Sequence, residues 1–339
     1  MTWCRSGISA VVLVASGFAM AGTEGWPASD RPAFTTVVLG TAGGLTEDNL
    51  SSYLLAPSGE VAFVAIDAGT LRAGIHEART ALRGLGVPSG PPEGWESAVL
   101  RERVKAYLIT HAHLDHIAGL VLNSPEDSRK SILALRPTIN DLKRHVFNWR
   151  TWPNLGDAGQ HPVGLYDYVV LREGVEQPIP GVDMTVEALA LSHGGVVSTA
   201  FLLQSAGSYA LYVGDTGPDA VENSKKLRHL WARTVPLVRA GKLRGMFLEV
   251  SYPNERPDDG LFGHLTPAWL FRELHRLADR VGADSPGADL RGLTVIITHV
   301  KPSSEPGADP RERIREQLDA LNDLGLRIVV PEQGDRIDF

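Results

Sequence analysis

The chain has 339 residues, with 33 Lys and Arg against 40 Asp and Glu, which gives a formal net charge of -7. Hydrophobic residues make up 43% of it and charged residues 22%, as in ordinary globular proteins, so the composition excludes a disordered, fibrous or polytopic membrane protein. The acidic balance and the lack of a long basic run argue against a nucleic-acid partner and favour a small-molecule ligand.

The first segment has the features of a cleaved export signal. Arg5 precedes an apolar stretch, and Ala19-Met20-Ala21 fits the small-x-small pattern that signal peptidase cuts. The apolar stretch is shorter than the ~20 residues of a membrane-spanning helix. We therefore expect residues 1–21 to be removed and residues 22–339 to form one exported domain, periplasmic or secreted, with no membrane attachment. An uncleaved N-terminal helix is the alternative.

Short aliphatic runs bounded by turn residues predict strands, and helical periodicity appears between them. In chain order, the expected strands are residues 61–66, 104–109, 184–191, 209–213, 246–250 and 293–297. The expected helices are residues 71–85, 268–281 and 311–324. Segments rich in Gly and Pro, at residues 88–94, 284–292 and 303–310, are expected to be surface loops. This alternation predicts an α/β protein.

A carboxylate or an imidazole stands at the end of each predicted strand. In chain order these residues are Asp67, then His111, His113, Asp115 and His116, then His193, Asp215, Glu249 and His299. Strands that share a direction deliver their C-terminal ends to one edge of a sheet, where α/β folds bind ligands. We therefore expect these side chains to converge.

Histidine and aspartate without cysteine form sites for borderline divalent metals, and the only cysteine, Cys4, lies in the predicted leader. In the HxHxDH segment, His111 and His113 can face one ion, while Asp115 and His116 can reach a second. We expect two divalent ions, Zn²⁺ first, with Mn²⁺ or Fe²⁺ as alternatives. Further ligands are expected from neighbouring strand ends, namely His193, Asp215 and His299. The alternative is a loop whose histidines only form hydrogen bonds.

These residues resemble a known family. HAHLDH after an apolar strand, followed by an isolated His193, a Gly-Asp-Thr aspartate and a final His299, resembles the metallo-β-lactamase superfamily. The continuation of HAHLDH through residues 117–125 is similar to the signature of class II cyclic-nucleotide phosphodiesterases, as are the Ser-His-Gly-Gly segment at 192–195 and the Gly-His-Leu-Thr-Pro segment at 263–267. The resemblance extends from Gly43 to His299.

The resemblance implies a metallo-β-lactamase-like αββα sandwich, in which two mixed β-sheets pack face to face with helices outside. It also implies how two metals share their ligands, with His111, His113 and His193 on one, Asp115, His116 and His299 on the other, and Asp215 between them. The implied reaction is hydrolysis of 3′,5′-cAMP or cGMP to the nucleoside 5′-monophosphate, by attack of a hydroxide that bridges the two ions.

The sugar alkoxide that departs in this reaction is a poor leaving group, so a proton donor is expected opposite the hydroxide. His264 is the candidate donor, and Glu249 is expected to orient and charge it. The pair resembles the glutamate and histidine outside the metal shell of tRNA 3′-processing endonucleases. Asp115 belongs to both the metal set and the catalytic set. Alternatively, His264 caps the helix that begins at Thr266-Pro267.

Three further residues are assigned around the centre. Asp67 is expected to accept a ring N–H from a metal-bound histidine and fix its tautomer, or else to be a plain turn aspartate. Asn49 is assigned to the substrate with the nearby Gly43-Gly44 turn, although a tight strand connection explains those glycines equally well. Trp152 either stacks on the nucleobase or packs in the core, as aromatic residues commonly do.

The expected partner is a small cyclic nucleotide and not nucleic acid, and the oligomeric state stays open, with a homodimer as one option. A hydrolase of a lactone, thioester or β-lactam would use the same metal core but would give no purpose to the pair formed by His264 and Glu249. An RNA-processing nuclease fits that pair but neither export nor the lack of a basic arm. A non-catalytic protein that binds metal or nucleotide is the third alternative, and the intact ligand set argues against it.

Overall fold

The computed structural model describes residues 31–90, 93–283, 285, 287–303 and 309–339. The predicted leader, residues 1–21, lies outside them, as does the boundary expected at residue 22. Pro32–Phe339 form one compact unit. Among the described residues, no helix is both long and apolar enough to cross a membrane.

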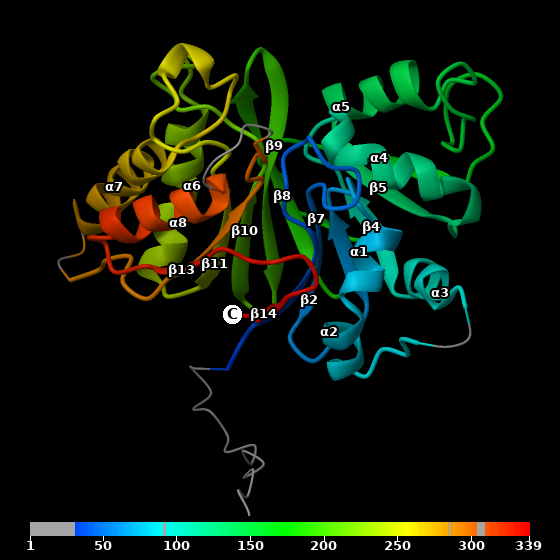
Figure 1. The fold of residues 1–339 in the computed structure, drawn as a ribbon, viewed down its shortest axis with the longest axis horizontal. Helices are drawn as coiled ribbons and strands as arrows, with labels where there is room; N and C mark the ends of the chain where they lie inside the picture. Colours follow the sequence, from blue (N-terminus) through cyan, green and yellow to red (C-terminus); the bar gives the residue numbers. More distant parts are fainter. Residues whose placement is uncertain (1–30, 91–92, 284, 286, 304–308) are drawn as a thin grey trace, which may run out of the picture. The chain divides into compact units, whose positions relative to one another are not determined.

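Two seven-stranded β-sheets form the centre of this unit (Figure 1). The strands of the first sheet are β1 (Phe34–Gly40), β2 (Ser52–Pro57), β3 (Phe63–Ile66), β4 (Val104–Leu108), β5 (Lys130–Leu135), β6 (Tyr166–Leu171) and β14 (Arg336–Asp338). The strands of the second sheet are β7 (Gln177–Pro178), β8 (Thr185–His193), β9 (Val196–Ser205), β10 (Ser208–Val213), β11 (Leu243–Glu249), β12 (Thr294–Thr298) and β13 (Arg327–Val329). The first sheet has the order β14-β1-β2-β3-β4-β5-β6 and the second β13-β12-β11-β10-β9-β8-β7.

Helices cover the outer face of each sheet (Figure 1). Those that accompany the first sheet are α1 (Arg72–Glu77), α2 (Arg79–Gly84), α3 (Trp95–Glu102), α4 (Leu114–Asn123) and α5 (Arg136–Asp141). Those that accompany the second are α6 (Lys226–Arg239), α7 (Pro267–Ala283) and α8 (Pro310–Leu321). Short 3-10 turns occur at Ser124–Glu126 and Asp258–Gly260, and a π-helical segment at Leu142–Val146.

Successive side chains of a strand point to opposite faces of its sheet, and this alternation produces the layers of the fold. In β3, Phe63 and Ala65 pack in the cluster beneath α1 to α5, while Val64 and Ile66 pack between the two sheets. A strand that is apolar on both faces must be covered on both, and the side chains of β4 and β10 to β12 divide in the same way. The expected αββα sandwich is therefore confirmed.

Strand direction brings the polar strand ends together. In the first sheet β3, β4, β5 and β6 are mutually parallel, and in the second β10, β11, β12 and β13 are. Because β9 is antiparallel to both β8 and β10, β8 runs in the same direction as β10. The C-terminal ends of β8, β10, β11 and β12 therefore meet at one edge of the second sheet.

All six predicted strands are present, and their bounds differ from the predicted ones by three residues at most. The predicted helices 268–281 and 311–324 correspond to α7 and α8. The single helix expected over residues 71–85 is wrong, because the chain breaks at Ala78 into α1 and α2. The buried residues Ile75, Ala78 and Leu82 keep a helical spacing across the break, so periodicity alone does not reveal it.

Candidate metal centre

The centre is built from strand ends of both sheets. His111 follows β4, and Asp115 and His116 lie in the first turn of α4. His193 is the last residue of β8, while Asp215 and His299 follow β10 and β12. Since the two sheets face each other, these segments, far apart in the sequence, come into contact.

One carboxylate oxygen lies in the middle of the histidines. The Oδ2 atom of Asp215 is 3.0 Å from the Nε2 atom of His299 and 3.2 Å from that of His116. It is 3.8 Å from the Nε2 atom of His193 and 3.9 Å from that of His111. The Nδ1 atom of His264 also lies 3.8 Å from this oxygen. Five imidazoles, two from each expected ligand set and that of His264, thus surround a single buried aspartate.

The ligand atoms fall into groups of three that lie within 4.8 Å of one another. One group is His111, His113 and His193, and another is Asp115, His116 and His299. These have the same members as the two expected ligand sets. Asp215 forms a third group with His111 and His116, one from each set. Asp215 therefore lies within reach of members of both groups.

Hydrogen bonds hold one nitrogen of most rings and leave the other facing the centre. The Nδ1 atoms of His116, His193 and His299 lie 2.8 to 2.9 Å from the Asp67 carboxylate, the Gly263 carbonyl and the Ser251 hydroxyl, respectively. The Nδ1 atom of His111 lies 3.0 Å from the Thr110 hydroxyl, and its Nε2 atom is buried without a hydrogen-bond partner among the described residues. A buried ring nitrogen without a partner fits a ligand for a metal ion.

Burial favours the neutral imidazole, which is the form that binds metals. It lowers the pKa values of His111, His113, His193 and His299 below the usual range. For His116 burial acts in the same direction, but Asp215, Asp67 and Asp115 outweigh it and raise the pKa.

The two carboxylates of the centre are held in the ionised form. Burial opposes ionisation of Asp215, but the neighbouring His299 and His116 outweigh it and hold its pKa well below the usual range. Burial also opposes ionisation of Asp115, and again His116 and His299 lower its pKa. Carboxylate oxygens and imidazole nitrogens together form a donor set that suits divalent metals such as Zn²⁺.

Solvent reaches the centre from one side. His113 is exposed and the Asp115 side chain keeps 18% of its surface accessible, whereas His111, His116, His193, Asp215 and His299 are all buried. His113 and Asp115 flank the N-terminus of α4. A ligand therefore approaches the centre along that end of the helix.

Asp67 lies fully buried behind the centre. Its Oδ2 atom is 2.8 Å from the Nδ1 atom of His116, and its Oδ1 atom accepts a hydrogen bond from the backbone N–H of Thr110 at 2.8 Å. The Thr110 hydroxyl also donates to this carboxylate. Of the two alternatives for Asp67, this geometry favours the one in which the carboxylate orients a histidine.

Glu249 and His264 form a buried pair beside the centre. The Nδ1 atom of His264 lies 3.0 Å from Glu249 Oε1, and the His264 ring centroid is 4.7 Å from that of His193. The alternative role for His264, capping α7, is filled by Thr266, whose hydroxyl accepts the backbone N–H of Trp269. Burial lowers the pKa of His264 to about 4 and raises that of Glu249 to about 7, and both shifts favour the uncharged form of the side chain.

The two residues assigned to substrate binding have partners of their own. The Asn49 side chain bonds to the backbone N–H and hydroxyl of Thr41 and closes the turn between β1 and β2. Trp152 packs against the core below the first sheet, and its indole N–H donates to Ser124. Among the described residues, no hydrogen bond or ring contact joins either residue to the metal centre, and their assignment to the substrate stays a prediction.

Sequence reasoning missed two hydroxyls and one cation. The Ser251 hydroxyl lies 2.9 Å from both Glu249 Oε2 and His299 Nδ1, so it donates to the first and accepts from the second. Thr110 does the same between Asp67 and His111. Lys301 donates to the Gly43 carbonyl, and its charge contributes to the low pKa of His264. Single Ser, Thr and Lys residues carry no periodic signal, so only the fold reveals them.

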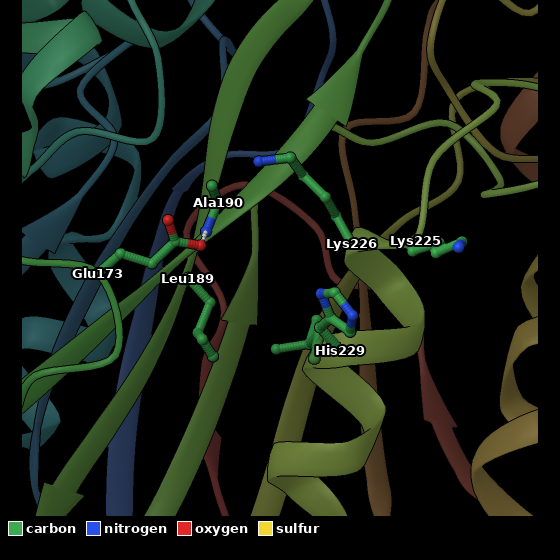
Figure 2. Close-up of a pocket in the computed structure, with 7 residues that line it drawn as sticks. Glu173, Leu189, Ala190, Lys225, Lys226 and His229 are labelled. Carbon is green, nitrogen blue, oxygen red and sulfur yellow. Dashed lines mark hydrogen bonds between the residues drawn. The ribbon is translucent and has the colours of Figure 1, made fainter.

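A separate hollow of about 280 Å³ lies between α6 and β8, lined by Glu173, Lys225, Lys226 and His229 among others. In Figure 2, the two lysine side chains point away from each other, and the Glu173 carboxylate accepts the backbone N–H of Ala190. The charged groups of this hollow therefore do not converge as those of the metal centre do.

The chain matches a family model and relatives of similar length. Residues 32–334 match the model of the cAMP phosphodiesterases class-II. A 3′,5′-cyclic-nucleotide phosphodiesterase of Aliivibrio fischeri is 43% identical over 311 residues, covering 91% of this chain and 93% of the relative. Another, from Schizosaccharomyces pombe, is 31% identical over 334 residues, covering 91% and 93%.

Solved structures agree with the fold. The crystal structure of unliganded yeast PDE1 is similar with a TM-score of 0.78 and 26% identity, covering 91% of this chain and all of that one. A metallo-β-lactamase fold protein, YhfI from Bacillus subtilis, is similar with a TM-score of 0.57 at 14% identity, covering 91% and 100%. The second likeness shows the fold alone, and it agrees with the predicted metallo-β-lactamase-like sandwich.

Replacing Asp67 should weaken metal binding although Asp67 touches no ion. In Asp67→Asn, an amide N–H₂ can face the Nδ1–H of His116, which favours the tautomer that carries its proton on Nε2. We expect metal affinity to fall by about 10- to 100-fold, measured by competition with a chelating dye. The exposed Asp323→Asn serves as the control. Equal affinity in the wild type and Asp67→Asn would contradict the role of Asp67.

Proposed function

Because the chain belongs to the class II cAMP phosphodiesterase family, we propose that it hydrolyses 3′,5′-cyclic nucleotides, cAMP or cGMP or both, to nucleoside 5′-monophosphates at a centre of two divalent ions. The observation that carries the two-ion proposal is the position of Asp215, whose single Oδ2 atom lies within 3.9 Å of four imidazole nitrogens from both ligand sets. One ion alone would leave part of this donor set without a purpose.

The chain supplies a complete set of ligands for the two ions. His111, His113 and His193 would hold one, Asp115, His116 and His299 the other, and Asp215 both. When bound, two such ions lower the pKa of water toward ~7 and offset the negative charge of the phosphodiester. We propose Zn²⁺ as the physiological metal on this donor set, with Mn²⁺ and Fe²⁺ as alternatives.

His264 is proposed as the proton donor. Hydrolysis joins a water oxygen to phosphorus and breaks the bond from phosphorus to O3′, and the O3′ atom must take up a proton as it leaves. The Nδ1 atom of His264 is occupied by Glu249 at 3.0 Å, which leaves Nε2 to carry the proton that is given up. Glu249 is held in turn by Ser251 and by the backbone N–H of Thr216, so the orientation of the pair is fixed before substrate binds.

We also propose that the protein acts outside the cytoplasm on a small-molecule substrate. Support for export comes only from the sequence of residues 1–21, which combines a basic residue, an apolar stretch and a small-x-small site. A homodimer stays a prediction.

The activity is tested with a panel of substrates on metal-loaded mature protein. We expect 3′,5′-cAMP and 3′,5′-cGMP to give only the 5′-monophosphates, identified by chromatography, and a chelator to abolish the reaction. The panel also contains 2′,3′-cAMP, bis-p-nitrophenyl phosphate, a lactone and nitrocefin. Faster turnover of the lactone or of nitrocefin, or formation of 3′-monophosphate, would contradict the proposal.

The donor is tested by His264→Ala. Loss of a general acid costs typically 10²- to 10⁴-fold in kcat, so we expect a fall in this range while the metal content, measured by mass spectrometry of the elements, stays that of the wild type. His275→Ala, which removes an exposed histidine paired with Asp323, is the control. A kcat near that of the wild type would reject His264 as the donor, and loss of metal would make it a ligand instead.

Export is tested by the mass of the protein recovered from the periplasm or the medium. Cleavage after Ala21 predicts a mature chain that begins at Gly22. The intact mass by electrospray should match residues 22–339. A protein that retains Met1 in that fraction would refute the predicted cleavage.

A further inference from the structure

Phe262 combines two features that folding alone disfavours. The residue is 66% exposed, and its backbone has φ of +51°. A bulky side chain is strained in the left-handed region, where glycine or asparagine is the ordinary choice. An exposed benzyl group also gains little from burial. Leu45 and Trp149 share both features, so a role for Phe262 must also follow from what surrounds it.

Phe262 precedes a residue that holds a histidine of the metal centre. It belongs to the loop from β11 to α7, two residues before His264. The carbonyl of the next residue, Gly263, accepts the Nδ1–H of His193 at 2.8 Å. The Phe262 carbonyl lies close to Gly194, where a Cβ atom would come within 3.1 Å of it. The turn at residues 262–263 is thus pressed against the segment that ends in His193.

The same loop provides a row of flat side chains that starts at the proposed proton donor. The Tyr252 ring lies 5.9 Å from the His264 ring, and the Arg256 guanidinium lies 4.6 Å from the Tyr252 ring centroid and 5.5 Å from that of Phe262. The Nε atom of Arg256 donates to the Gly260 carbonyl at 2.7 Å. Tyr252, Arg256 and Phe262 are called the aromatic rim below.

Other exposed apolar residues lie beside the centre. Leu114, 74% exposed, stands between His113 and Asp115. Leu45, 76% exposed, follows the turn at Gly43, where an added Cβ atom would come within 2.3 Å of the His299 ring. Exposed apolar surface grouped around a polar cleft is typical of a binding site for a ligand with an apolar part.

We propose that the nucleobase of the substrate stacks on Phe262, supported by Arg256, while the cyclic phosphate lies at the metal centre. This inference rests on the proposed function and names the residue that holds the base. Every base has a π-face, so aromatic stacking gives affinity without strong choice among bases. The Arg256 guanidinium adds a positive charge beside an anionic ligand. Stacking would bury the exposed Phe262 ring and offset the strain of its backbone, and this stabilisation is present only when the nucleotide is bound.

The substitution Phe262→Ala tests whether the nucleobase stacks on Phe262. Loss of one stacking partner should raise KM for both cAMP and cGMP by roughly 5- to 150-fold, with kcat and metal content nearly unchanged. Phe262→Tyr and Phe262→Trp should restore the low KM. Ribose 3′,5′-cyclic phosphate, which lacks a base, should be hydrolysed equally by the wild type and Phe262→Ala. Isothermal titration with a slowly hydrolysed phosphorothioate analogue should show the same loss of affinity.

Three control variants separate stacking on Phe262 from binding at another exposed apolar residue and from an effect on the backbone. Leu122→Ala removes an exposed apolar side chain at the far end of α4 and should leave KM unchanged. Trp149→Ala removes another exposed aromatic side chain and should also leave it unchanged; a rise in KM there in place of Phe262→Ala would move the base to that residue and overturn the proposal. Phe262→Gly relieves the strained backbone, so its melting temperature should not fall although its KM rises.

The failure of this inference is distinct from failure of the proposed function. A wild-type protein that hydrolyses no 3′,5′-cyclic nucleotide overturns both. An active wild type with an unchanged KM in Phe262→Ala overturns only the proposal that the nucleobase stacks on Phe262. An equal rise in KM for the base-free substrate also overturns it, because it assigns Phe262 to the phosphate or to the shape of the loop.

Discussion

The whole site depends on burying the Asp215 carboxylate among imidazoles at the seam between two sheets. A carboxylate taken out of water needs opposite charge or hydrogen-bond donors around it. Here these come from His111 and His116 on the first sheet and from His193 and His299 on the second. Neither sheet alone brings together both halves of this shell, so the face-to-face packing of the sheets is also what assembles the centre.

Around this carboxylate, a second layer of polar groups decides which atom of each ring faces inward. Asp67, Thr110, Ser251 and the Gly263 carbonyl each take one ring N–H. Every one of these partners is buried or part of the backbone, so the rings are oriented before any ligand arrives. Orientation fixed in this way avoids the entropy loss of ordering ligands upon binding, and it leaves the Nε2 lone pairs directed at the same small volume.

How much the sequence alone could predict follows from the same geometry. The polar residues at strand ends were visible because apolar runs such as residues 104–109 stop abruptly at His111, and the αββα arrangement came from the resemblance. Strands such as β2, β5 and β9 were missed, because a short run that is buried on both faces lacks the alternation that marks a strand. Thr110 and Ser251 were missed because single hydroxyls act through neighbours that only folding provides. Phe262 was missed because the sequence around an aromatic residue does not indicate that its backbone has a φ of +51°.

The end of β11 and the loop that follows it to α7 have three separate roles: they hold the proposed proton donor, orient two histidines of the metal centre and carry the aromatic rim. Through Glu249 and Ser251 it holds the proposed proton donor and the Nδ1 atom of His299, and through the Gly263 carbonyl it holds the Nδ1 atom of His193. Its outer side carries the aromatic rim. The inner side of this loop is thus bound to the metal centre by hydrogen bonds that tolerate little change, whereas its outer side faces solvent. Substitution of Phe262 on the outer side can therefore alter ligand binding while the centre stays intact, because the outer Arg256 bonds to the Gly260 carbonyl whereas the inner His264 bonds to Glu249.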